Sequence, residues 1–190
     1  MALDTMLDHW SAKFFTFFKR YDQAIASLES LVRKHPDDKE AWSTLGWLYS
    51  QRNDKPKAVT ALERAVALDP GNYAVHFNLG YLQQELGHGD AAIREFDETI
   101  RLKPTEDRAW YGRGLIYLNR REFDRAIPDL KEAAKLQPFN PYAGYYLAVA
   151  YQLSGQFDRA VKEYKRIKGF DPKIAAQTAR DIGYTDPDLP

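Results

Sequence analysis

Residues 39–70 carry the clearest pattern in the chain and read KEAWSTLGWLYSQRNDKPKAVTALERAVALDP. Each half places apolar residues on one face at helical spacing: Trp42, Leu45, Gly46 and Tyr49 in the first half, Ala58, Leu62 and Ala65 in the second. Between the halves, residues 53–56 (NDKP) supply a turn and a helix start, and Pro70 ends the second helix. The stretch therefore predicts an antiparallel helical hairpin, in which Gly46 allows the two helices to approach closely.

The same pattern recurs every 34 residues along most of the chain. Two columns repeat five times at this spacing: Ala24, Ala58, Ala92, Ala126 and Ala160, and Pro36, Pro70, Pro104, Pro138 and Pro172. A fixed period of this length indicates stacked copies of one helical unit. We number the copies repeats 1 to 5; they cover residues 5–38, 39–72, 73–106, 107–140 and 141–174.

Repeat 2 shows the series W-x2-L-G-x2-Y, Ala, Leu, Ala and Pro, which resembles the signature of the tetratricopeptide repeat (TPR) family. Repeat 4 departs from the signature mainly through Arg113, and repeat 3 has His76 and Gln83 in place of Trp and Tyr. Repeat 1 is degenerate; its first half keeps only Ser11, Ala12 and Phe15. The resemblance implies an all-α fold, a right-handed α-solenoid of about five helix-turn-helix hairpins.

The last residues predict a helix that covers repeat 5. Residues 173–184 (KIAAQTARDIGY) have apolar side chains at helical spacing and Gly183 as a stop, and a polar tail follows over residues 185–190. Pro128 lies about four residues into a predicted helix, where it removes at most one early hydrogen bond, so we expect that helix to persist. We expect a single TPR superhelical domain over residues 1–184.

The TPR resemblance implies that positions 2, 5, 9, 12 and 13 of each repeat line a concave groove, the usual binding surface of the family. In this chain these positions are rich in aromatic residues, which are frequent among interface hot spots. The predicted groove residues are Trp47, Phe77, Tyr81, Tyr111 and Tyr145, with Asn78 and Arg108 to hold polar groups of a peptide. The alternative is that neighbouring repeats bury these rings as ordinary core.

One specialised TPR function, the clamp for the carboxylate end of a chaperone tail, is disfavoured. The family pattern needs Lys and Asn in one repeat, Asn in the next and two basic residues in the third. The corresponding residues here are Ser43, Trp47, Asn78, Arg108 and Gly112. Only Asn78 and Arg108 fit, so this chain offers a site for a single anionic or carbonyl group at most.

The N-terminal helix predicted before residue 20 carries an aromatic stripe made of Trp10, Phe14, Phe17 and Phe18. Terminal repeats usually end in a polar face, so this stripe predicts an oligomer or partner interface. Two alternatives stay open: residues 1–4 fold over the stripe, or the stripe touches a membrane surface. Membrane contact is disfavoured because Asp4 and Asp8 oppose the few basic residues nearby.

Composition removes several classes of function. Twenty-seven basic and 27 acidic side chains give a formal net charge of zero, which gives no basis for predicting nucleic-acid binding. The chain has no Cys, its four His residues are scattered and no catalytic motif occurs, so we expect no enzyme, no metal and no cofactor. No apolar run suffices for a signal or a membrane span, which predicts a cytoplasmic protein. The expected function is that of a peptide-binding scaffold, adaptor or assembly chaperone; the alternative is a self-assembling structural protein.

Overall fold

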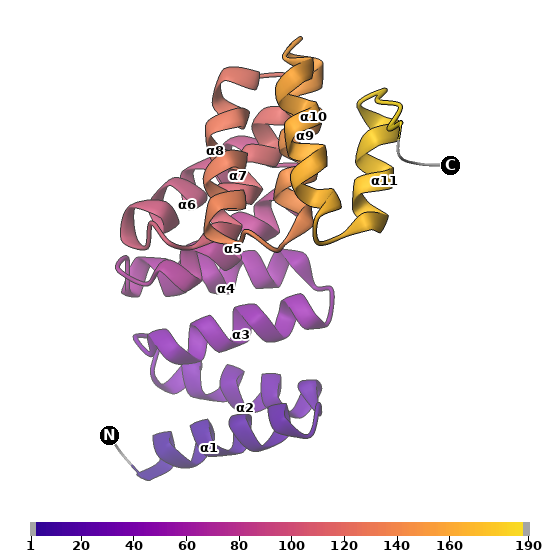
Figure 1. The fold of residues 1–190 in the computed structure, drawn as a ribbon. Coiled ribbons are helices and arrows are strands. Elements are labelled where there is room, and N and C mark those ends of the chain that lie inside the picture. The colour runs from indigo at the N-terminus through magenta and orange to yellow at the C-terminus, as the bar shows by residue number, and fades with distance from the viewer. Residues whose placement is uncertain (1–2, 188–190) are drawn as a thin grey trace. The chain divides into compact units, whose positions relative to one another are not determined.

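The computed structural model describes residues 3–187, with side chains from residue 6 onward. All regular structure in this part of the chain is helical (Figure 1). The helices are α1 (Leu3–Phe17), α2 (Tyr21–Lys34), α3 (Lys39–Gln51), α4 (Lys55–Leu68), α5 (Tyr73–Glu85), α6 (Gly89–Leu102), α7 (Asp107–Asn119), α8 (Phe123–Leu136), α9 (Pro141–Leu153), α10 (Phe157–Lys168) and α11 (Pro172–Asp181). The predicted all-α repeat fold is confirmed.

The chain divides into two compact bodies, an N-terminal body of residues 1–102 and a C-terminal body of residues 103–190. In the N-terminal body the helices pair as hairpins α1/α2, α3/α4 and α5/α6, and successive hairpins stack on each other. In the C-terminal body the hairpins are α7/α8 and α9/α10, and α11 packs against both α9 and α10. Whether the five hairpins form a single domain stays a prediction.

Each hairpin closes around small residues in the columns that define the repeat. A Cβ atom placed on Gly46 of α3 would lie 2.5 Å from Cγ of Leu62 in α4, so the two helices touch where the glycine stands. The alanines that recur every 34 residues are all fully buried: Ala24, Ala58, Ala92, Ala126 and Ala160. This spacing explains why the repeat needs Gly or Ala at both positions.

Five of the described helices begin after an Asp or Asn whose side chain caps the helix: α3, α4, α5, α9 and α11. Asp38 caps α3 by accepting a hydrogen bond from the Ala41 amide at 2.9 Å, and Asp171 caps α11 through Ile174 at the same distance. Gly183, with a φ of 70°, follows the end of α11 as predicted. Helix α8 runs through Pro128 without interruption, also as predicted.

Repeat 1 forms a helical hairpin despite its degenerate signature. Ala12 of α1 is 2% exposed and Leu28 of α2 is 1% exposed, so the hairpin has the same small-residue contact as the others. His9 also contacts Asp38, the N-cap residue of α3, with 2.7 Å between Nε2 and Oδ2. These contacts account for the fold of a unit that lacks most of the signature residues.

Candidate functional site

Four predicted groove residues lie in the N-terminal body, on α3 and α5. Trp47 and Tyr81 occupy the same position in successive repeats and are 39% and 49% exposed. The Trp47 ring meets Tyr21 edge to face, with 6.0 Å between ring centroids. Large aromatic rings that stay this exposed on neighbouring helices offer apolar contact area to a partner.

Tyr81 is held in place by an acidic neighbour on its own helix. Its hydroxyl donates a hydrogen bond to Oε1 of Glu85 at 3.0 Å, and Glu85 also faces Lys55 Nζ at 3.5 Å. The hydrogen bond to Glu85, together with partial burial, raises the pKa of Tyr81. The ring is therefore a neutral, oriented surface with a polar rim.

Phe77 and Asn78 are half-buried. The Phe77 ring lies 6.1 Å from the fully buried ring of Phe96 in α6, so it contributes to the hairpin core as well as to the surface. Phe77 is therefore packed partly as core, which was the alternative for the groove residues, and remains partly accessible at the surface. Trp47 and Tyr81 stand further from the core than Phe77 does.

The C-terminal body contains a cavity of about 180 Å³ beside two of the predicted groove residues, Arg108 and Tyr111. Its lining residues are Asp107, Arg108, Tyr111, Ala133, Gln137, Asn140, Tyr142 and Ala143. The repeat periodicity had already assigned Tyr142 to the groove face. Helical spacing does not predict Gln137 and Asn140, because they lie in the turn between α8 and α9.

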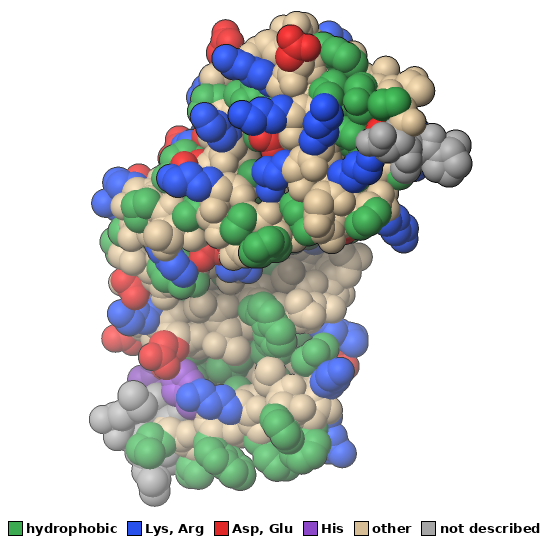
Figure 2. Space-filling view, in the orientation of Figure 1, with side chains coloured by type: hydrophobic (Ala, Val, Ile, Leu, Met, Phe, Trp, Pro, Cys, Tyr) green, Lys and Arg blue, Asp and Glu red, His purple; other side chains and the backbone are tan. Residues whose placement is uncertain are grey.

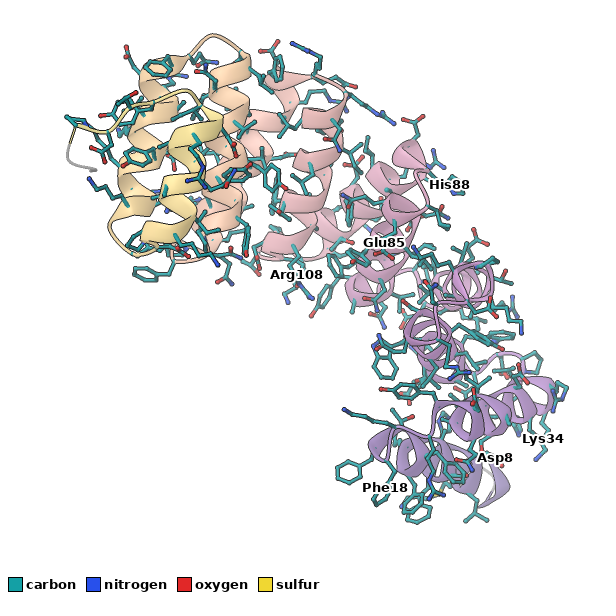
Figure 3. All side chains as sticks on the ribbon, turned by 90° about the vertical axis from the view of Figure 1, so that its right-hand side faces the viewer. Asp8, Phe18, Lys34, Glu85, His88 and Arg108 are labelled. Carbon is teal, nitrogen blue, oxygen red and sulfur yellow. The ribbon has the colours of Figure 1, made fainter. Side chains whose placement is uncertain are left out.

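Arg108 is anchored at the mouth of this cavity by a buried carboxylate. Its Nε donates to Oε1 of Glu106 at 2.6 Å, while Lys103 Nζ donates to Oε2 at 3.1 Å. Burial of Glu106 opposes its ionisation, but the two cationic hydrogen bonds outweigh this and lower the pKa of Glu106. The Arg108 side chain itself is 63% exposed and points away from the ribbon in Figure 3.

Tyr111 and Tyr145 are linked through a third ring, Tyr146. The centroid distances are 5.9 Å from Tyr111 to Tyr146 and 4.8 Å from Tyr145 to Tyr146. The Tyr145 hydroxyl donates to Oδ2 of Asp181 in α11 at 2.6 Å, and this hydrogen bond is the main reason that the pKa of Tyr145 rises to about 12. Burial raises the pKa of Tyr111 to about 12. The structure thus joins Arg108, Tyr111 and Tyr145 into one cluster.

The predicted groove residues are divided between the two bodies: Trp47, Phe77, Asn78 and Tyr81 belong to the N-terminal body, and Arg108, Tyr111 and Tyr145 to the C-terminal body. Within each body the residues share one set of helix faces. A joint grip of Asn78 and Arg108 on one polar group stays a prediction.

A second cavity, of about 340 Å³, occupies the repeat-equivalent place in the N-terminal body. It is lined largely by polar residues. Lys39 and Asp69 form an ion pair there, with 2.8 Å between Nζ and Oδ2. These two residues hold the repeat positions that Asp107 and Gln137 hold in the other body. The hydrogen bond between the two groups raises the pKa of Lys39 and lowers the pKa of Asp69. Equivalent positions of two repeats thus line a cavity in each body, and only the cavity of the N-terminal body contains this ion pair.

The α1 aromatic face consists of Met6, Leu7, Trp10, Phe14, Phe17 and Phe18, and all six side chains are exposed. Trp10 is 66% exposed and Phe17 is 82% exposed. Figure 2 shows hydrophobic side chains gathered along α1, and Figure 3 shows Phe18 at the outer edge of the N-terminal body. One alternative was that residues 1–4 fold over this stripe. Residues 3 and 4 belong to α1 itself, and residues 1 and 2 lie outside the described part of the chain.

His76 behaves as the packed core imidazole that its place in the Trp column predicts. It is 5% exposed; Nδ1 lies 2.7 Å from Oε2 of Glu95, and Nε2 lies 3.2 Å from the Pro70 carbonyl. Within residues 3–187, no cluster of three or more His, Asp or Glu side chains is arranged to hold a metal ion. The described helices include none that is both long enough and apolar enough to span a membrane.

Comparison with known proteins connects this architecture to one repeat family. A tetratricopeptide repeat family model matches residues 19–73 and 77–141, and a second one matches residues 117–181. Among solved structures, a MamA protein is similar with a TM-score of 0.84 and 23% identity over 100% of both chains. MamA from Desulfovibrio magneticus RS-1 (residue 41 to the end) gives a TM-score of 0.83 and 17% identity over 90% of this chain and 97% of that one.

A further similar structure is YrrB, described as a TPR protein with an unusual peptide-binding site. It has a TM-score of 0.80 and 16% identity over 89% of this chain and 88% of that one. At these identities the three structures establish the fold alone. No protein of curated function matches the chain.

Proposed function

Because the chain belongs to the tetratricopeptide repeat family, whose repeats form protein-interaction scaffolds, we propose that it is a non-catalytic adaptor or assembly chaperone that binds a peptide segment through the predicted groove residues. The observation that carries this proposal is the exposure of Trp47 and Tyr81 at the same position of successive repeats. An extended or helical peptide laid across α3 and α5 would cover both rings.

The chemistry of these two rings suits peptide capture. Each supplies a large apolar surface with few rotatable bonds, so binding orders little that was mobile before. Tyr81 is already fixed by Glu85, which lowers the entropic cost further. Exposed rings with a polar rim match the composition of interfaces that bind peptides and proteins.

Within the C-terminal body, the cavity beside Arg108 and Tyr111 offers a place for a peptide side chain. Its volume of about 180 Å³ is sufficient for a side chain, not for a drug-sized ligand. Arg108 and Asn140 at its rim offer donors to a peptide carbonyl or carboxylate. In that body the polar contact sets the register of a bound peptide, and the Tyr111 ring supplies apolar contact area.

The comparison with YrrB supports peptide binding as the activity, because that protein of similar fold is described as having a peptide-binding site. Its site is also described as unusual, so its residues are not carried over to this chain. The proposal rests on the side chains of this protein.

A selected peptide tests the proposal. A random peptide library is displayed, binders to the wild-type protein are isolated, and one is titrated calorimetrically against Trp47→Ala and Tyr81→Ala. We expect each substitution to weaken binding at least about tenfold, roughly 1.4 kcal/mol. The matched control is Phe157→Ala, since Phe157 is 41% exposed against 39% for Trp47 but lies outside the predicted groove. Unchanged affinity in both groove variants, with intact melting transitions, would reject the peptide site.

A second candidate function is supported by the α1 aromatic face. Five exposed apolar side chains of α1, together with that of Phe18 just after it, form a patch that monomeric proteins rarely leave in water. Under this candidate the protein docks, on itself or on a partner, through α1. It is compatible with a peptide groove elsewhere in the chain.

A further inference from the structure

The α1 aromatic face is a continuous surface rather than a set of scattered side chains. Trp10 stacks on Phe14 with 5.6 Å between centroids, Phe14 meets Phe18 at 4.8 Å, and Phe18 meets Phe17 at 5.2 Å. The four rings are between 43% and 82% exposed. Ring-to-ring contact orders the patch in advance, so a partner meets a preformed apolar surface.

The location of this patch identifies the kind of surface that fits it. Leu7, Phe14 and Phe18 stand at positions 3, 10 and 14 of repeat 1, the positions predicted to contact a neighbouring repeat. At positions 3 and 10 of repeats 2, 3 and 5 the residues are at most 5% exposed: Ala41, Leu48, Val75, Leu82, Ala143 and Ala150. These three residues of the α1 aromatic face therefore form a repeat-stacking surface against which no described part of the chain is stacked.

The other terminal hairpin is closed by the chain itself. Helix α11 packs on α9 and α10 and buries Ala175, Ala179 and Ile182 against them. Its outward residues Lys173 and Arg180 are charged and exposed. A second copy of the chain therefore cannot continue the stack at α10 without displacing α11, whereas the stacking surface of α1 is open to it.

We propose that a second copy of this chain covers the α1 aromatic face, with α1 packed on α1 in a head-to-head, isologous dimer. The proposal rests on the second candidate function, docking through α1, and names its partner. Because each copy offers the same patch, the contact closes after two subunits and does not propagate into a filament.

The size of the patch agrees with a dimer interface. Taking about 200 Å² for each aromatic side chain, the exposed fractions of the four rings correspond to roughly 500 Å² of apolar surface. Met6 and Leu7, 57% and 55% exposed, extend it towards the roughly 800 Å² that each partner buries in a stable interface.

The charges near α1 allow this contact. Asp8 contacts α2, because Lys34 Nζ donates a hydrogen bond to its Oδ2 at 3.1 Å. The Asp8 carboxylate therefore lies beside α2 and not on the apolar face. Figure 3 shows Asp8 and Lys34 together on one side of the hairpin and Phe18 on another. The exposed Lys13 is at the edge of the patch by helical spacing and stays in water at the rim. Among the side chains of α1 that the structure describes, dimerisation therefore desolvates the rings and leaves the Asp8 carboxylate beside α2.

Sedimentation equilibrium between about 1 and 100 μM tests the proposal first. We expect the wild type to dimerise in this range and Phe17→Asp to raise the dissociation constant at least about tenfold. The matched control is Phe139→Asp in the C-terminal body, because Phe139 is 79% exposed against 82% for Phe17. A wild type that stays monomeric, or a dimer weakened equally by both substitutions, would overturn the proposal.

Cysteine pairing then tests the head-to-head geometry, since the chain has no natural Cys. We expect oxidation of Phe14→Cys to give a dimer linked through Cys at residue 14 of both copies. When Phe14→Cys is mixed with Tyr81→Cys, a dominant bond between residues 14 and 81 would instead show α1 bound in the groove of another copy and would contradict the proposal. The selected peptide should bind Phe17→Asp as it binds the wild type; dimer loss with intact peptide binding separates this proposal from the peptide site.

Discussion

Gly144 of α9 leaves room for Arg166 of α10 at the place where repeats 2 and 4 have the tryptophan of the repeat signature. In repeats 2 and 4 the indoles of Trp42 and Trp110 donate to the carbonyls of Pro36 and Pro104, at 3.0 and 2.8 Å. Repeat 5 has Gly144 in the tryptophan column, and Arg166 Nη1 donates to the equivalent carbonyl, that of Pro138, at 2.9 Å. A Cβ atom on Gly144 would overlap Arg166 Nη2, so the glycine makes room for the guanidinium.

This relationship predicts that the effect of Gly144→Ala changes sign with residue 166. In the wild type the added methyl displaces Arg166 and lowers the free energy of unfolding. In an Arg166→Ala background the clash is gone, and the better helix propensity of alanine stabilises the protein by about 1 kcal/mol. Urea unfolding of the four members of the double-mutant cycle measures this; equal effects of Gly144→Ala in both backgrounds would contradict it.

A buried ion pair in repeat 4 predicts a second compensation. Arg113, at the signature leucine position, makes two 2.7 Å hydrogen bonds to the carboxylate of Asp129, which is 3% exposed. Arg113→Leu alone leaves that carboxylate buried without its cation and should cost about 3 kcal/mol. Adding Asp129→Ala recreates the Leu45/Ala61 pair of repeat 2 and should recover most of the loss in urea unfolding. A double variant as unstable as the single one would reject this account.

Because of Glu106, we predict that the free energy of unfolding depends on pH in the acid range. Its pKa is below the ordinary value because the hydrogen bonds from Arg108 and Lys103 outweigh the opposing effect of burial. A depressed folded-state pKa adds stability above the unfolded-state value of about 4.3, and this stability is lost as pH falls through the folded-state pKa. Glu106→Gln should therefore destabilise by about 1 kcal/mol at pH 7 and by nothing well below pH 4. A difference that persists in strong acid would contradict the assignment.

Residues 185–190 were expected to form a polar tail, but Asp186 in this segment contacts the helices. We therefore predict that it contributes to the free energy of unfolding. Asp186 is 7% exposed and accepts hydrogen bonds from the buried Tyr164 hydroxyl and, at 2.6 Å, from Lys168 Nζ. Asp186→Ala leaves the Tyr164 hydroxyl buried without its acceptor and should lower the free energy of unfolding by about 2 kcal/mol. Asp37→Ala, at an exposed aspartate, serves as the comparison, and the same loss in both variants would argue against a specific role for Asp186.

The fold was predictable from the sequence because its determinants are local and repeated. Small residues that meet at 34-residue spacing, such as Gly46 facing Leu62, occur in several copies, so each copy supports the prediction made from the others. Helical spacing also placed Phe17 on the aromatic stripe of the first helix, while the sequence left open whether residues 1–4 cover that stripe. Periodicity gives the face on which a residue lies.

Periodicity does not give the partner of a residue that breaks the pattern. Arg113 was visible as a departure from the signature, but its acceptor Asp129 lies in the other helix of the hairpin. Gln137 and Asn140 line a cavity from a turn, where helical spacing carries no information. The hydrogen bond from Arg108 to Glu106 depends on side-chain conformations at the start of α7. A pattern of residue types does not specify these conformations.

The most direct measurement for the central claim is affinity capture from native lysate with three baits, read by mass spectrometry. The baits are the wild type, Trp47→Ala/Tyr81→Ala in the groove and Phe14→Asp/Phe18→Asp on α1. The account predicts a partner that binds the wild type and the α1 variant and is lost with the groove variant. A partner lost only with the α1 variant, or a wild type that recovers nothing except itself, would contradict the claim that the groove residues are the binding site.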